Sequence, residues 1–287
     1  MIKIVDTYAE IPSLFEDGKF QIEKWRIYAE KIYPALADIF ESETENYTKN
    51  GDYTFEKDFL PIINAVCGSF EFEKLHEVFI EATENLNSRI KENFGRVLDA
   101  DVVFWLGLGT SAGCAGEING RNTVLLGAEK IIELDWCSKE QMCALVYHEL
   151  GHIFHSQRGK MEQAAEENEN SFVYQLFTEG IAMYFEQTVF GNAEFYHQDK
   201  NGWKAWCDEH FAEMLADFDC DLSAMTRFSQ RYFGDWCDYR GRGDVGYYLG
   251  TRFIYELLQN YSFDEIINFD IETVYGHYKS FAKKHIG

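Results

Sequence analysis

Apolar residues recur at helical spacing through much of the first hundred residues. They do so from about residue 18 to 47 and again from about residue 70 to 94, at intervals of three and four residues, as on the buried face of an amphipathic helix. In the first stretch these positions are Trp25, Ile27, Tyr28, Ile32, Tyr33, Leu36, Ile39 and Phe40. The first third of the chain is therefore predicted to be mainly helical.

The pattern changes at Val102. There VVFWLGLG forms a short apolar run that the turn-rich stretch GTSAGCAGEINGRN follows, and NTVLLGAEKIIEL then offers a second stretch with β-branched residues. Short apolar runs between turn residues are typical of buried strands. The two runs predict a small sheet.

Helical patterning returns after these strands. In SKEQ, Ser138 is a good N-cap residue and Gln141, three residues later, completes a capping box. A helix is predicted from here to about Gln157, ending near Gly159. The apolar residues around its histidines indicate that much of this helix is buried.

The rest of the chain completes the predicted architecture. A further helix is predicted over about residues 170–190, ending at Gly191, and helix continues beyond it except between residues 234 and 246. Three prolines and no Ser/Gly-rich linker leave few places for a domain boundary. We predict a mostly α, α+β fold, with a helical N-terminal part (residues 1–100) and a part that contains the sheet (residues 101–287), or one continuous domain.

Composition and charge narrow the expected partners. A chain of 287 residues, 46% hydrophobic and 16% aromatic, can bury a core. Its 26 Lys and Arg against 49 Asp and Glu give a formal net charge of −23, which repels phosphate backbones, so no nucleic-acid partner is expected. The acidity indicates a well-solvated surface or, alternatively, a cleft that favours basic peptides.

Targeting signals and cysteines indicate the compartment. The first twenty residues lack the apolar core of a secretory signal, and no uncharged apolar run is long enough to cross a bilayer, so no membrane partner is expected. The seven cysteines form no CxxC pair. Reduced thiols in a cytoplasmic protein fit this odd number better than a disulfide framework does.

The stretch VYHELGHIFH, residues 146–155, contains the pattern HExxH. His148 and His152 are four residues apart, so both imidazoles project from one face of the predicted helix, as chelation of one ion requires. Glu149 lies between them, where a carboxylate can take a proton from a metal-bound water. His155 lies about 10 Å further along the axis than His148. We expect it to neighbour the site or face a substrate, without binding the ion.

A third ligand must come from elsewhere in the chain. Candidates in the acidic run MEQAAEENEN, which is more typical of a solvated face, are Glu162, Glu166, Glu167 and Glu169. Glu179 differs because apolar residues flank it in LFTEGIA, which predicts that its side of the helix is buried. A buried carboxylate requires a partner, and a metal ion, an arginine or a hydroxyl group would serve.

HELGH followed by TEGIAMYFE resembles the motifs of gluzincin zinc metallopeptidases. The EGxxxYxE form is similar to the aminopeptidase N-like branch and to predicted zinc-dependent proteases of unknown function. The resemblance implies a zincin-like fold, with a small mixed sheet beside the HExxH helix, and one zinc ion held by His148, His152 and Glu179. It also implies that Glu149 is the general base and that Glu186 is a carboxylate orienting the ligands by hydrogen bonds. For Glu186 the alternative is a solvated helix charge.

The resemblance extends to GDVGYYLGTRFIYELL, which looks like the Tyr-x-x-Gly helix start that carries the transition-state tyrosine of those aminopeptidases. It implies that Tyr247, with Gly250 three residues later, donates a hydrogen bond to the oxyanion. Tyr248 is the adjacent alternative, and a core or surface role stays open for either. The resemblance covers about residues 123–258, and nothing before Val102 resembles a known family.

Two departures from the family pattern put aminopeptidase specificity in question. The spacing between His152 and Glu179, residues 153–178, is 26 residues, longer than in the typical aminopeptidase. The Gly-x-Met-Glu-Asn motif of the exopeptidases is missing, although Glu129 follows Gly127 and Ala128 at the corresponding place. Glu129 would bind a free amino terminus or be an ordinary charge at a strand end.

The sequence therefore predicts a zinc-dependent metallopeptidase that hydrolyses peptide bonds in a peptide or protein. Residues 123–127, as an edge strand, would align an extended substrate by main-chain hydrogen bonds. Two alternatives stay open: a zincin-fold binding or regulatory protein without turnover, and a zinc hydrolase of a non-peptide amide or epoxide. Glu149 argues against the first alternative. A structural zinc site needs no unligated carboxylate beside the ion and is normally closed by four protein ligands.

Overall fold

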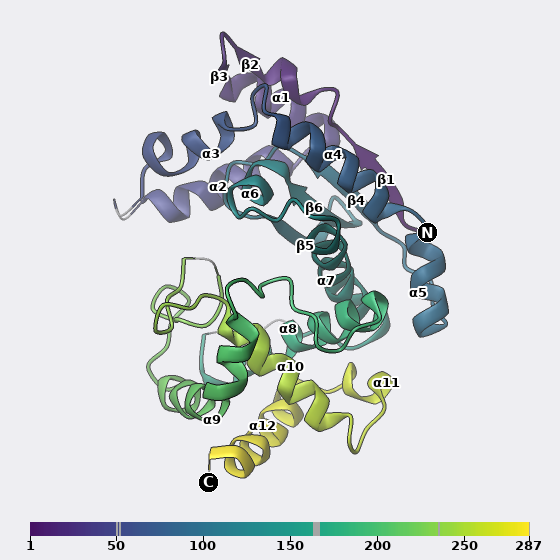
Figure 1. The fold of residues 1–287 in the computed structure, drawn as a ribbon, viewed down its shortest axis with the longest axis vertical. Coiled ribbons are helices and arrows are strands. Elements are labelled where there is room, and N and C mark those ends of the chain that lie inside the picture. The colour runs from purple at the N-terminus through teal and green to yellow at the C-terminus, as the bar shows by residue number, and fades with distance from the viewer. Residues whose placement is uncertain (50, 52, 163–166, 235, 287) are drawn as a thin grey trace. The chain divides into compact units, whose positions relative to one another are not determined.

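A computed structural model describes residues 1–287 except residues 50, 52, 163–166, 235 and 287 (Figure 1). The described chain is a mixed α and β protein in which helix predominates, so the predicted mostly α, α+β class is confirmed. It forms two compact units, Met1–Glu149 and Leu150–Gly287, whose boundary lies inside helix α7 (Lys139–Arg158).

The first unit contains a four-stranded sheet, a small hairpin and the helices around them. The sheet strands are β1 (Lys3–Asp6), β4 (Asp101–Trp105), β5 (Gly113–Ile118) and β6 (Arg121–Gly127), and the hairpin strands are β2 (Phe15–Glu16) and β3 (Lys19–Phe20). The helices are α1 (Ile22–Ile32), α2 (Leu36–Thr48), α3 (Leu60–Asn64), α4 (Phe70–Thr83), α5 (Leu86–Phe94), α6 (Ala128–Glu133) and the first half of α7, with short turns η1 (Ile11–Leu14) and η2 (Phe55–Phe59).

The strand order is β1-β4-β6-β5, with β1 and β6 parallel to β4 and with β5 antiparallel to β6. Both predicted strands are present as β4 and β6, although residues 128–133 form α6 and not strand. The prediction that residues 123–127 form an edge strand is wrong, because β6 is paired with β4 on one side and β5 on the other. The edges of this sheet are β1 and β5, and β5 comes from the turn-rich stretch that was not predicted to pair.

The two faces of β4 bury different aromatic side chains. Successive residues of a strand point to opposite faces, so Phe104 and Trp105 meet different helices. Phe104 packs against Phe79 of α4, whereas Trp105 packs against Trp25 of α1 and Phe40 of α2. All five residues are buried. Strand β1 precedes residue 100 and strand β4 follows it, and the two strands pair in this sheet. The predicted division into residues 1–100 and 101–287 stays a prediction.

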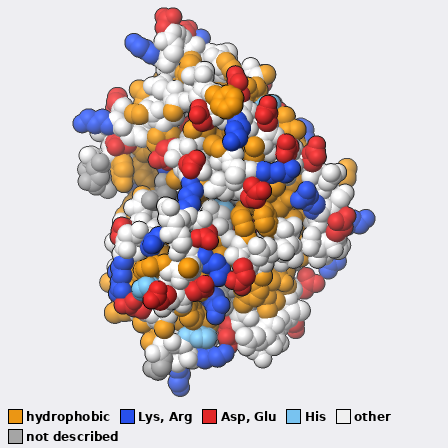
Figure 2. All heavy atoms as spheres, viewed as in Figure 1, with side chains coloured by type: hydrophobic (Ala, Val, Ile, Leu, Met, Phe, Trp, Pro, Cys, Tyr) orange, Lys and Arg blue, Asp and Glu red, His pale blue; other side chains and the backbone are white. Residues whose placement is uncertain are grey.

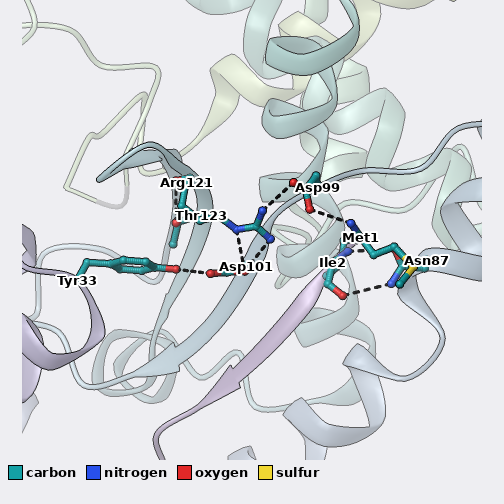
Figure 3. A network of polar contacts seen from close by, with 8 residues as sticks. All are labelled: Met1, Ile2, Tyr33, Asn87, Asp99, Asp101, Arg121 and Thr123. Atoms are coloured by element: carbon teal, nitrogen blue, oxygen red, sulfur yellow. Dashed lines mark hydrogen bonds and ion pairs between the residues drawn. The ribbon is translucent and has the colours of Figure 1, made fainter.

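A polar network closes the end of the sheet at which β4 begins (Figure 3). The carboxylate of Asp101 accepts hydrogen bonds from the Tyr33 hydroxyl at 2.7 Å and from Arg121 Nε and Nη2 at 3.0 and 2.8 Å. Arg121 Nη1 also donates to Asp99, which contacts the backbone nitrogen of Met1. Asp101 is buried and Asp99 is exposed, so the Asp101 carboxylate requires these donors far more than Asp99 does.

The second unit is helical in the part that the structure describes. It contains the second half of α7, α8 (Glu169–Phe190), α9 (Trp203–Asp221), α10 (Val245–Leu257), α11 (Phe263–Ile266) and α12 (Ile271–Ile286). Helix α8 is apolar around most of its circumference, as expected of a central helix, and it packs against α10 and α12. The predicted interruption between residues 234 and 246 lies in the irregular connection between α9 and α10.

The ends of the two central helices agree with their predicted signals. The backbone N–H of Gln141 donates to Ser138 Oγ at 3.2 Å, which is the predicted capping interaction of α7. Helix α8 begins at a capping box between Asn168 and Ser171 and ends at Gly191, whose φ of 80° lies in the left-handed region that glycine adopts readily.

The described surface mixes acidic, basic and apolar side chains. Figure 2 shows Asp and Glu side chains interspersed with Lys and Arg over the face that it draws. Among the described residues, no helix combines the length and apolarity that crossing a bilayer requires.

Replacing Asp101 by Asn tests the polar network. We expect a loss of about 1–3 kcal/mol in the free energy of unfolding, because the partly buried donors of Tyr33 and Arg121 lose a charged acceptor. Urea unfolding of Asp101→Asn and of the exposed control Asp99→Asn measures this. The control should lose clearly less, and equal losses would show that burial of Asp101 does not decide its contribution.

Candidate metal centre

The HExxH residues lie in the middle of α7. His148 and Glu149 are nearly inaccessible, with 4% and 7% of their surfaces exposed, and the side chain of His152 is 16% exposed. The apolar residues around them are buried, including Leu145, Leu150 and Ile153. The motif therefore occupies the buried side of α7, where an imidazole needs a partner.

Close packing of α7 against α8 brings the second histidine to the glutamate helix. A Cβ atom at Gly151 would lie only 2.8 Å from Ala182 Cα on α8, so any larger residue there would push the two helices apart. His152 follows Gly151 directly, and Glu179 lies one turn before Ala182. The glycine of HELGH thus places His152 beside Glu179.

Three side chains converge here. One potential ligand atom from each of His148, His152 and Glu179 lies within 4.8 Å of the other two, and His152 Nε2 is 3.3 Å from Glu179 Oε2. Ligand atoms about 2.0–2.2 Å from a tetrahedral ion lie about 3.4 Å apart. The two imidazoles and the carboxylate can therefore hold one metal ion, as the sequence predicted.

Glu149 lies beside strand β5, within the first unit. A Cβ atom at Gly113, the first residue of β5, would lie 2.8 Å from Glu149 Oε1 and 2.8 Å from Leu145 Cδ1. A larger residue at position 113 would require the side chains of Glu149 and Leu145 to shift. Gly113 is a site residue that sequence reasoning missed, because its stretch was read as turn.

The alternative third ligands make other contacts. Glu162 pairs with Lys160 and accepts the backbone N–H of Ile271, Glu167 accepts the backbone N–H of Arg227, and Glu169 accepts the hydroxyl of Tyr275. Glu166 lies outside the described residues. Of the described candidates, Glu179 is the one that joins the two histidines.

His155 is a core residue. It is fully buried, and its ring meets the ring of Phe177 edge-on, with centroids 5.8 Å apart. Burial, and to a smaller extent the nearby His152, lowers the pKa of His155 to about 4, so the imidazole is neutral at pH 7. The expectation that His155 does not join the ligands agrees with the described cluster, whereas the alternative that it faces a substrate is wrong.

Glu186 is fully buried and pairs with a histidine that sequence reasoning missed. His197 Nδ1 lies 3.1 Å from Glu186 Oε2 and 3.2 Å from Oε1, and His197 Nε2 lies 3.0 Å from Gln198 Nε2. The amide of Gln198 donates to Nε2, so Nδ1 carries the proton that His197 donates to Glu186. Glu186 is thus not a solvated charge, and its effect on the ligands stays a prediction.

The two adjacent tyrosines of α10 have different surroundings. Tyr248 is 2% exposed and its hydroxyl donates to Asp208 at 2.7 Å, with burial raising its pKa. Tyr247 is half-buried and its ring meets Phe233 edge-on. Helix α10 crosses α8 in backbone contact at Gly250 and Gly180, the residue after Glu179. Tyr248 is therefore engaged in the core, and the catalytic role of Tyr247 stays a prediction.

Glu129 is not placed to bind a free amino terminus. Its side chain is buried, with 1% of the residue exposed, and both carboxylate oxygens accept backbone hydrogen bonds, from Gly107 at 2.9 Å and from Gly109 at 3.0 Å. It is not a solvated strand-end charge either.

Replacing Glu179 by Ala tests the metal centre. With zinc as the probe ion, we expect the affinity to fall by more than about 10–100-fold, which is the loss typical of removing a group that only orients a ligand. Competition with a chelator of known affinity measures the change. Glu167→Ala, from the acidic run, is the matched control and should bind zinc as the native chain does. Equal affinities for both variants would remove Glu179 from the ligand set.

Comparison of the chain with protein-family models, with curated proteins and with solved structures gives no match. The function must therefore be inferred from the chain's own residues.

Proposed function

We propose that this chain is a zinc-dependent metallopeptidase that hydrolyses peptide bonds. The observation that supports this most strongly is the convergence of His148, His152 and Glu179, with Glu149 next to the first histidine. Two imidazoles and a carboxylate suit zinc, and three protein ligands leave a coordination position open, as catalytic zinc sites require. Zinc bound here would supply an activated water and polarise the substrate carbonyl.

Glu149 is assigned the proton transfers. It would take a proton from the attacking water and return that proton to the leaving amine. Its position supports this role, because it belongs to the ligand helix without being a member of the cluster, and because it is 7% exposed. A carboxylate in such surroundings is shielded from bulk water, which strengthens its electrostatic interaction with a developing charge.

Strand β5 is assigned the alignment of the substrate. It is an edge of the described sheet, and an extended peptide can add to a free edge by main-chain hydrogen bonds. Its first residue, Gly113, lies against Glu149. A peptide on this edge would thus run beside the general base, a role that the sequence had assigned to residues 123–127.

The oxyanion donor in this proposal is Tyr247. Its hydroxyl would stabilise the negative charge that develops on the carbonyl oxygen. The engagement of Tyr248 with Asp208 supports the choice between the two.

Replacing Glu149 by Gln tests the general base. We expect zinc to be retained and kcat to fall by about 10²–10⁴-fold, because Gln cannot accept the proton. Turnover of a library of N-blocked, internally quenched peptides measures kcat, and small amides and epoxides serve as further substrates. Glu140→Gln, at the exposed start of α7, is the control. Undiminished turnover in Glu149→Gln would overturn the assignment; a zinc-loaded native protein inactive on every substrate would favour a binding role.

The matched variants Tyr247→Phe and Tyr248→Phe test the oxyanion donor. Tyr247→Phe should lower kcat by about 10²-fold or more, as loss of one oxyanion donor does, with little change in stability. Tyr248→Phe should instead lower the free energy of unfolding, by about 1 kcal/mol, because the hydrogen bond to Asp208 is lost. Steady-state kinetics with thermal unfolding distinguish the two, and the reverse pattern would move the role to Tyr248.

A further inference from the structure

The segment that leaves β4 is held by buried side chains where sheet pairing ends. Leu106 donates its backbone N–H to the Tyr28 hydroxyl at 3.0 Å, and its carbonyl accepts from Trp25 Nε1 at 2.8 Å. The next two hydrogen bonds come from Gly107 and Gly109 to Glu129. Buried side chains of α1 and α6 thus satisfy the backbone groups that a solvated loop would leave to water.

Glu129 is the charged member of this set. Each of its oxygens accepts one backbone N–H, Oε2 from Gly107 and Oε1 from Gly109, which is left-handed with a φ of 81°. A hydrogen bond to an ionised acceptor is about twice as strong as a neutral one. The carboxylate therefore fixes two points of the β4–β5 loop, residues 106–112, at once.

The same loop leads directly into the edge strand. Beyond Gly109, the Ala112 carbonyl accepts the backbone N–H of Gly127 at 2.9 Å, and Ser111 Oγ donates to the Gly113 carbonyl at 2.5 Å. Gly113 then lies against Glu149. Three residues thus separate Gly113 from Gly109, the second point that Glu129 fixes.

We propose that Glu129 is a positioning residue, which holds the β4–β5 loop and so sets the place of the β5 edge beside Glu149. The part of this proposal that concerns substrate alignment rests on the proposed function. The part that concerns the loop does not, since it needs only the described contacts.

The charges around Glu129 make this positioning depend on pH. Burial raises the pKa of Glu129 to about 7 and outweighs the two amides and Lys130, which lower it. Lys130 pairs with Glu133, and the phenol of Tyr28, which burial keeps un-ionised, also interacts electrostatically with Glu129. As pH falls through about 7, a proton on one oxygen weakens one of the two amide hydrogen bonds. The folded pKa exceeds the ordinary 4.5, so the contribution of Glu129 to stability is complete below about pH 4.5 and decreases as pH rises through about 7.

Amide NMR of the full-length protein tests the loop. Between pH 5.5 and 8.5, the resonances of Gly107, Gly109 and Gly113 should shift together with a midpoint near 7. In Glu129→Gln the shared transition should disappear, because Gln accepts from one amide only and does not ionise. Glu133→Gln, on the same helix, should titrate as the native chain does. If Glu129→Gln does not fold, the native titration decides. The absence of a common transition, or its persistence in Glu129→Gln, would overturn the proposal.

Kinetics test the link to the substrate. At pH 8, Glu129→Gln should raise KM for a blocked peptide by about 5–10-fold, which corresponds to the loss of roughly one hydrogen bond to the substrate. It should leave kcat within about 3-fold. A fall in kcat with KM unchanged would contradict the role of the β5 edge. If the native protein has no turnover, the proposed function fails, whereas the amide titration still decides whether Glu129 holds the loop.

Discussion

The close packing of α7 on α8 at Gly151 determines whether this chain can hold a metal ion. Two histidines one turn apart on a helix offer two ligands, and a third must come from another element. Because Gly151 has no side chain, α8 approaches closely enough for Glu179 to reach 3.3 Å from His152. A larger residue at position 151 would push α7 and α8 apart and so separate His152 from Glu179, although position 151 is not itself a ligand. The same requirement recurs where Gly180 meets Gly250, so glycines set the spacing on two sides of α8.

Two buried carboxylates, Glu129 and Glu186, and the partly buried Glu179 have different partners and therefore different tasks. Glu179 meets an imidazole in the candidate metal centre, Glu186 meets His197, and Glu129 meets two backbone amides. Each arrangement satisfies a group that would otherwise be costly to bury. The three residues are all glutamates, so their partners distinguish Glu179, the candidate ligand, from Glu129, which holds a loop.

Local signals predicted the helices well. Ser138 and Gln141 cap α7, and Gly191 ends α8, because these interactions involve residues that are neighbours in the sequence. Strands β1 and β5 were not predicted. Strand β1 has only four residues, and β5 begins in a glycine-rich stretch that forms a strand by pairing with β6. For the same reason the sequence could not show which strand lies at the edge.

The candidate site was predictable where it depended on helical periodicity. Residues four apart on a helix share a face, so the sequence could place His148 and His152 together. The apolar neighbours of Glu179 predicted a buried side chain, and the side chain is partly buried, with 17% of its surface exposed. The pairing of His197 with Glu186 depends on how an irregular segment folds back on α8, and no local pattern encodes that.

We propose that His148, His152 and Glu179 bind one zinc ion. Zinc-edge X-ray absorption of the native protein, loaded with one equivalent of zinc, tests it most directly. We expect the zinc coordination shell to contain two imidazole nitrogens and oxygen ligands at about 2.0–2.2 Å, and no sulfur. A zinc–sulfur distance of about 2.3 Å, or a shell without imidazole, would place the ion elsewhere and contradict the account.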